Sequence, residues 1–122
     1  MKFTKIVFWI AGIWGVLLLC SLYFLSDAIG RKDPPSITHL EYYFGFLGVA
    51  LAWQLAFFVI ARDPARFRPM IIPAIAEKLI YVASITILYS TGRASMETGM
   101  ATLPDLILAV MFTVAYGKTR PT

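Results

Sequence analysis

Glu77 and Lys78 place a carboxylate and an ammonium side by side inside an otherwise uncharged run of the sequence, residues 70–89. They lie about two helical turns from the start of that run. Charged groups this far inside an apolar segment are costly in free energy, and they usually mark an ion path, a proton relay or a ligand site. Because consecutive side chains on a helix point roughly 100° apart, we expect the two charges to need separate partners and not to pair with each other.

Glu77 is also the first residue of a polar stripe that continues at Tyr81 and Ser84, with spacings of four and three residues. Such spacings place side chains on one face of a helix, so the stripe would face the interior of a helix bundle. Two polar residues of other apolar runs could share that interior. These are Gln54, whose amide needs a hydrogen-bond partner inside a membrane, and Asp105. The five residues form the candidate ligand-binding set.

Two roles are open for Glu77. In the first, its carboxylate forms an ion pair with an arginine of the preceding turn, which contains Arg62, Arg66 and Arg68. In the second, it handles a proton or binds a ligand. We expect Lys78 to extend along its aliphatic stem toward the membrane surface.

The sequence lacks the residues that several kinds of chemistry require. The sequence contains no phosphate-binding loop, dinucleotide fingerprint, haem or iron–sulfur cysteine set, or nucleophile elbow. The single histidine, His39, belongs to no pair with the spacing of a known metal-ligand motif, and the single cysteine, Cys20, cannot form an internal disulfide. We therefore assign no catalytic residue, no metal and no cofactor, and an enzyme is the less favoured class.

Four apolar runs must position these residues, and each is long enough to cross a membrane. Of the 122 residues, 59% are hydrophobic, which leaves too little polar surface to coat a soluble globule. A helix of twenty residues, such as residues 42–61, rises about 30 Å, the thickness of the hydrocarbon layer. The sequence predicts an all-α polytopic membrane protein, one domain over residues 1–122. Its four helices would form an up-down-up-down bundle, at about 6–25, 40–61, 70–90 and 102–117.

The positions of Lys and Arg predict the orientation of these helices. Seven of them flank the N-terminus, the turn at residues 62–69 and the C-terminus, and three lie in the two opposite connections. An excess of cations marks the cytoplasmic side, so both termini are predicted to be cytoplasmic, in a bacterial inner membrane. Arg62, Arg66 and Arg68 would meet lipid head groups there. Because the net charge of +4 is scattered between apolar runs, it does not indicate nucleic-acid binding.

Two patterns predict how the helices begin and pack. Thr38 with Glu41, and Thr102 with Asp105, fit the capping box, in which a hydroxyl and a carboxylate bond the first free amides of a helix. Small side chains at three- and four-residue spacings predict a face for close packing on a neighbouring helix, because small residues are the usual basis of helix association in lipid. This small-residue face consists of Gly45, Gly48, Ala52 and Ala56.

The chain resembles two groups of membrane proteins. Its size, charge layout and predicted four-helix topology are similar to those of small bacterial DoxX-like proteins, a resemblance that implies a quinone-linked or oxidative-stress accessory. Residues 22–26 (LYFLS) and 54–58 (QLAFF) resemble segments of the emopamil-binding and sigma-2-receptor group. That group carries an acid one turn before the glutamine, where this chain has Ala50, so the resemblance implies a lipophilic pocket and not the group's chemistry.

Three functions are consistent with the sequence. The first is a small accessory or structural subunit that packs against larger membrane proteins or further copies of itself. The second is a protein that binds a lipophile or a quinone in a pocket near Glu77, Tyr81 and Gln54. The third is a small transporter or channel with Glu77 and Asp105 on a polar path. In each case the expected partners are membrane lipids and other membrane proteins.

Overall fold

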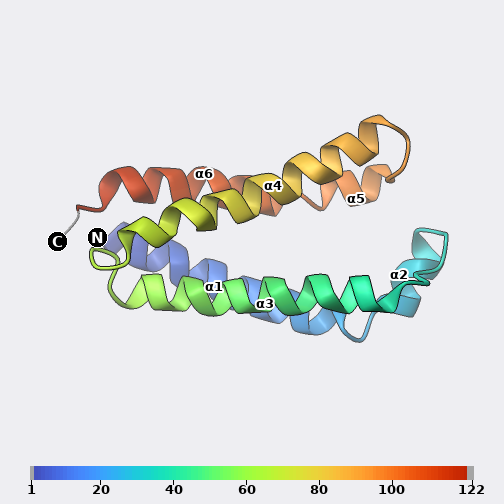
Figure 1. Ribbon diagram of the computed structural model, residues 1–122, viewed down its shortest axis with the longest axis horizontal. Helices are drawn as coiled ribbons and strands as arrows, with labels where there is room; N and C mark the ends of the chain where they lie inside the picture. Colours follow the sequence, from blue (N-terminus) through green and yellow to red (C-terminus); the bar gives the residue numbers. More distant parts are fainter. Residues whose placement is uncertain (1, 121–122) are drawn as a thin grey trace.

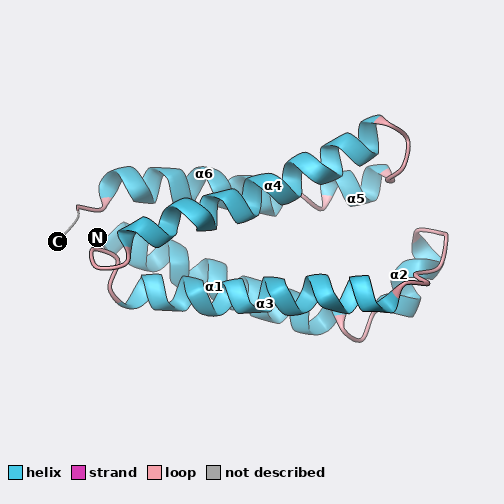
Figure 2. Cartoon of the chain, in the orientation of Figure 1, coloured by secondary structure: helices cyan, strands magenta, loops and turns pink. Residues whose placement is uncertain are grey.

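The computed structural model describes residues 2–120, and most of them are helical (Figure 2). The four long helices are α1 (Lys2–Leu22), α3 (Leu40–Arg62), α4 (Ile71–Ser90) and α6 (Leu103–Lys118). Three short elements join them: α2 (Ser26–Lys32), the 3-10 helix η1 (Arg68–Met70) and α5 (Met96–Met100). The four long helices, with η1 and α5 as extensions of α4 and α6, are long and apolar enough to cross a membrane. This confirms the four predicted apolar helices.

The two connections that were expected to be polar loops contain short helices. Helix α2 lies in the first and α5 in the second. The hydroxyl of Ser95 caps α5 by accepting a hydrogen bond from the Thr98 amide at 3.2 Å. The cap satisfies an amide that has no partner inside the helix, which is why such a short element can begin there.

Neither of the predicted capping boxes forms. Helix α3 begins after His39, whose ring contacts Glu41 at 3.3 Å, and no side chain caps its first turn. At the start of α6 the Thr102 hydroxyl donates instead to the carbonyl of Gly99 at 2.7 Å. Asp105 pairs with Lys78. The first box fails because the helix begins at Leu40, which puts His39 and not Thr38 at the cap position. In the second box, a carbonyl and a lysine compete with the helix amides for the two side chains.

The four long helices form two pairs, α1 with α3 and α4 with α6 (Figure 1). The pairs meet near the start of α1 and the end of α6, where the main core takes side chains from all four helices. Three buried rings from three helices meet in this core. Phe8 stacks on Phe112 with centroids 4.3 Å apart, and Phe57 meets Phe112 edge-on at 5.0 Å. We call these three residues the aromatic core.

The opposite end of the molecule is packed differently. Its smaller buried cluster, Leu19, Leu47 and Ala50, comes from α1 and α3 alone, and Figure 1 shows α3 and α4 diverging toward this end. The two halves are linked there by polar contacts. Asp33 accepts hydrogen bonds from the hydroxyls of Ser95 at 2.7 Å and Thr98 at 3.0 Å. The halves are therefore tied at both ends, and between the ends the rings of Phe46 on α3 and Tyr81 on α4 stack with their centroids 5.6 Å apart.

Close packing between α1 and α3 depends on glycines of α1. A Cβ atom at Gly12 would overlap the ring of Phe58, and one at Gly15 would overlap the side chain of Gln54. Within a lipid-like environment, this close approach increases van der Waals contact between the two helices. Close packing thus occurs at glycines of α1, whereas the sequence predicted it at the small-residue face of α3.

The small-residue face of α3 does not provide the expected packing within the chain. Gly45 has open space where its Cβ would be, Gly48 has only the Tyr23 hydroxyl within 4 Å, and Ala52 is exposed. Ala56 is half-buried. The reason is that α3 turns a larger apolar face toward α1, because α1 itself supplies the small residues.

Arg68 holds the end of α6. Its guanidinium lies 3.7 Å from the centroid of the Tyr116 ring and donates to the carbonyls of Tyr116 at 3.2 Å and Thr119 at 2.7 Å. Carbonyls at a helix end lack partners inside the helix, so this cation stabilises them. Of the three arginines expected at lipid head groups, Arg68 therefore has a structural role, whereas Arg62 and Arg66 are exposed.

Replacing Gly12 by alanine should lower the thermal stability of the protein. The added methyl group overlaps Phe58, and overpacking of this kind costs about 1–3 kcal/mol. The matched control is Gly45→Ala, where the methyl group enters open space and the melting temperature should stay the same or rise. Circular dichroism melting in detergent measures both. Equal effects of the two variants would contradict the packing of α1 on α3.

Candidate functional site

Lys78 is the buried charge at the centre of the candidate site. Its side chain is 8% exposed, and its Nζ atom lies 3.1 Å from Oδ1 of Asp105 and 3.5 Å from Oε2 of Glu77. Its Nζ is also 5.4 Å from the centroid of the Phe57 ring. The three charged residues, which we call the charge cluster, therefore lie directly against the aromatic core.

The structure corrects three expectations about this cluster. Lys78 does not extend to the surface, because it is buried against Asp105. Glu77 and Lys78 do contact each other, since the long lysine stem bends toward the neighbouring carboxylate. Among the described residues, the ion contact of Glu77 is with Lys78 and not with an arginine of the turn. Arg68, the arginine nearest in sequence, is held by the end of α6.

The charges and hydrogen bonds within the charge cluster do not balance. With every group ionised, two carboxylates share one ammonium, which leaves a net charge of −1. Oε2 of Glu77 is buried and makes no hydrogen bond within residues 2–120. A buried polar atom without a partner is costly, and in native proteins it usually has a structural or functional explanation.

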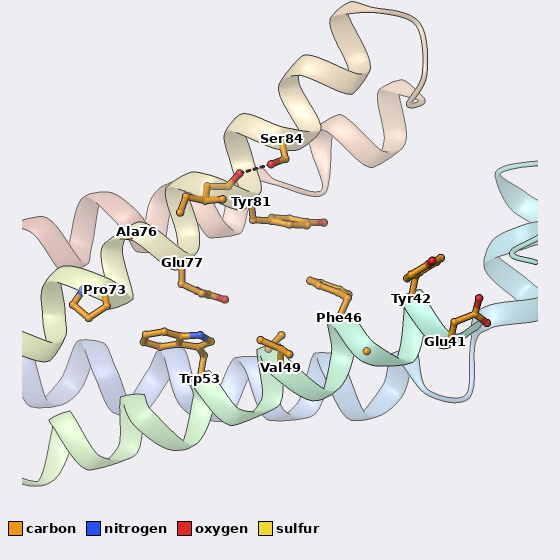
Figure 3. A pocket seen from close by; sticks show the side chains of 13 residues that line it. Glu41, Tyr42, Phe46, Val49, Trp53, Pro73, Ala76, Glu77, Tyr81 and Ser84 are labelled. Atoms are coloured by element: carbon orange, nitrogen blue, oxygen red, sulfur yellow. Dashed lines mark hydrogen bonds between the residues drawn. The ribbon is translucent and has the colours of Figure 1, made fainter. Parts of the chain in front are cut away.

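A large cleft opens between α3 and α4 next to the cluster, with a volume of about 830 Å³ (Figure 3). Helix α3 contributes Phe46, Val49 and Trp53 to its walls. Helix α4 contributes Glu77 and Tyr81, whose side chains extend into the space between the helices. The volume lies within the range of about 300–1,000 Å³ that is typical of small-molecule sites, and such sites also combine apolar walls with a few polar groups.

A smaller cavity of about 200 Å³ adjoins the cleft on the side of α1 and α6. Trp14 and Gly15 of α1 line it, together with Gln54 and the charge cluster. The cavities share part of their walls, so the second lies directly behind the first. The shared residues are Phe46, Ala50, Glu77 and Tyr81. We call the two spaces the cleft and the inner cavity.

The five residues selected from the sequence come together around these two spaces. Glu77 and Tyr81 line both, Ser84 lines the cleft, and Gln54 and Asp105 line the inner cavity. The Ser84 hydroxyl already donates to the carbonyl of Ile80 within its own helix at 2.8 Å, as Figure 3 shows. Because this hydroxyl hydrogen is already used, Ser84 is less available to hydrogen-bond a ligand than the other four residues are.

The sequence did not identify two further residues of the site. Lys78 was assigned to the membrane surface, although its position next to Glu77 was already a signal that both could face the same interior. Trp53 forms a wall of the cleft and is adjacent to Gln54 in the chain. An aromatic residue in an apolar helix carries no signal that separates a cleft wall from a lipid-facing side chain.

Replacing Lys78 by methionine should strongly destabilise the protein, because both carboxylates of the cluster lose their cation. Breaking a buried ion pair from one side typically costs about 3–5 kcal/mol. The double variant Lys78→Met/Asp105→Asn should melt at a higher temperature than the single variant, since one unpaired carboxylate is then removed. The control is Lys32→Met, at an exposed position of α2. A Lys78→Met variant with the melting temperature of the original protein would refute this role.

Models of protein families, curated proteins and solved structures all give no match to this chain. The resemblances to DoxX-like proteins and to the emopamil-binding group therefore stay predictions from the sequence. The function is inferred below from the geometry of the cleft, the inner cavity and the charge cluster.

Proposed function

We propose that this protein is an integral membrane protein that binds a lipophilic molecule in the cleft between α3 and α4. One observation carries the proposal: an apolar cleft of about 830 Å³ is lined by Glu77 of the charge cluster, whose Oε2 contacts Lys78 at 3.5 Å and makes no hydrogen bond in the described chain. The apolar walls suit a hydrocarbon skeleton, and the cluster suits a polar group at one end of it.

The surface of the long helices supports insertion into a membrane. Large apolar side chains are exposed along all four, with Leu17, Val49, Ile80 and Ile107 each at least 58% exposed. Apolar surface this extensive is rare on soluble monomers, and lipid would cover it. We place the chain in the membrane as four antiparallel spans, with both termini and the turn at residues 62–69 on the cytoplasmic side.

In this placement a ligand would enter sideways from the lipid. The cleft lies between two spans, and its walls run along α3 from Glu41 to Trp53 and along α4 from Pro73 to Ser84, so most of its opening would face hydrocarbon. A lipophile already dissolved in the membrane would need no aqueous path. Trp53 and Tyr81 offer flat apolar surfaces against which a ring or chain could pack.

The accessory-subunit function is the second candidate, and a different observation favours it. Gly45, Gly48 and Ala52 form an exposed strip on α3 that no helix of this chain covers closely. Such a strip would allow the helix of another membrane protein to approach closely. A transporter or channel has less support, because the buried aromatic core fills the bundle between the charge cluster and the end of the molecule.

Filling the cleft should abolish ligand binding. Ala76→Phe adds a ring at the cleft wall, whereas Ala83→Phe adds the same ring at an exposed position of the same helix outside the cleft. Native mass spectrometry of protein extracted in mild detergent should show a copurified lipophile on the original protein and on Ala83→Phe. Occupancy should fall about tenfold or more in Ala76→Phe. Equal occupancy in both variants, or no bound lipophile in any of them, would refute the proposal.

Cysteine labelling tests the orientation in intact cells. In a Cys20→Ala background, a membrane-impermeant maleimide should label Arg31→Cys from outside. Arg66→Cys should react only after the cells are opened, because its turn carries the cytoplasmic cations. Both native side chains are exposed, so both cysteines should be accessible to the reagent on their own side. Labelling of both sites from the outside would disprove the four-span arrangement.

A further inference from the structure

Gln54, which lines the inner cavity, has a buried polar atom without a hydrogen bond in the described chain. Gln54 is 1% exposed, and its Nε2 donates to the carbonyl of Ala50, one turn back in the same helix, at 2.8 Å. A carbonyl oxygen can only accept a hydrogen bond, so the nitrogen must be the amide atom that faces Ala50. The amide oxygen, Oε1, therefore points away from its own helix, and it makes no hydrogen bond within the described chain.

The position of this oxygen is fixed by the packing of α1 on α3. It lies against Gly15, at the point where any larger residue of α1 would collide with it. Gln54 and Gly15 both line the inner cavity, and so does Glu77, the other residue with an unbonded buried oxygen. The two residues come from α3 and α4, and both line one space of about 200 Å³.

These two atoms share one chemical property, because an amide oxygen and a carboxylate oxygen are both hydrogen-bond acceptors. The ammonium of Lys78 contacts both acids of the cluster, Asp105 at 3.1 Å and Glu77 at 3.5 Å. The Gln54 oxygen is therefore the one with neither a hydrogen bond nor an ion contact in the described chain. A donor that entered the inner cavity could pair with the Gln54 oxygen. A carbonyl or ether oxygen could not, and it would leave that oxygen unpaired, which is the costly case.

We infer that the polar end of the bound lipophile is a hydrogen-bond donor, a hydroxyl or an amine, that occupies the inner cavity between Gln54 and Glu77. This inference rests on the proposed binding of a lipophile in the cleft and adds the chemical class of its head group. The apolar remainder of the ligand lies in the cleft, because the two spaces share walls at Phe46 and Tyr81. A quinol, an alcohol or an amine fits this description, whereas a quinone, a ketone or an ether does not.

The test compares three probes that have the same hydrocarbon chain. Tritiated hexadecan-1-ol is bound to the purified protein at one fixed detergent concentration, and hexadecan-1-amine and hexadecyl methyl ether are used as competitors. The alcohol and the amine should bind about tenfold or more tightly than the ether, which accepts hydrogen bonds but donates none. A tighter amine would identify an ammonium facing Glu77, and a tighter alcohol would identify a hydroxyl. Either order supports a donor head group.

Two variants separate this inference from the proposed function. Gln54→Leu removes an acceptor at nearly constant size, so it should weaken the alcohol about tenfold while leaving the ether unchanged. Its melting temperature shows whether it folds, and replacement of a buried amide by an apolar group should not lower it. Ala76→Phe should block every probe.

Each outcome decides one of the two claims. If the ether binds as tightly as the alcohol, and Ala76→Phe blocks both, the cleft binds lipophiles but the donor inference is wrong and the inner cavity holds water. If Gln54→Leu folds and leaves the alcohol affinity unchanged, the inference is again overturned. If no probe binds saturably, the proposed function itself fails.

Discussion

The ion contact between Lys78 and Asp105 is the interaction on which the interior of this protein depends. It joins α4 to α6 at a depth where an isolated charge would be too costly to keep. The same ammonium also contacts Oε2 of Glu77 at the longer distance of 3.5 Å, and that oxygen makes no hydrogen bond within the described residues. The charge cluster thus joins one helix pair and leaves an oxygen without a hydrogen bond at the site.

The cleft follows from an unequal distribution of packing. Rings from α1, α3 and α6 close the bundle at one end, and the charge cluster lies against them through Phe57. Beyond the cluster, the buried side chains come from α1 and α3 alone, and α3 and α4 diverge (Figure 1). The contacts of Asp33 with Ser95 and Thr98 tie the halves together again at the far end.

The site combines an apolar surface with a polar one. Trp53, Val49 and Ile80 provide apolar walls, which suit a molecule that is already dissolved in lipid. Gln54 and Glu77 provide acceptor oxygens that make no hydrogen bond within the described chain. An amphiphilic ligand with a donor at its end would match both surfaces at once, and it would remove the cost of the two buried oxygens.

The sequence alone determined the four apolar helices, because hydropathy and length are properties of each segment by itself. It also determined that Glu77, Tyr81 and Ser84 share one face, since helical spacing is local. Only the tertiary structure decided the partner of Lys78, the packing role of Gly12 and Gly15, and the unbonded oxygen of Gln54. Each of these depends on which helices become neighbours and on how far a flexible side chain can reach. Neither property is encoded in the spacing of residues along a single helix.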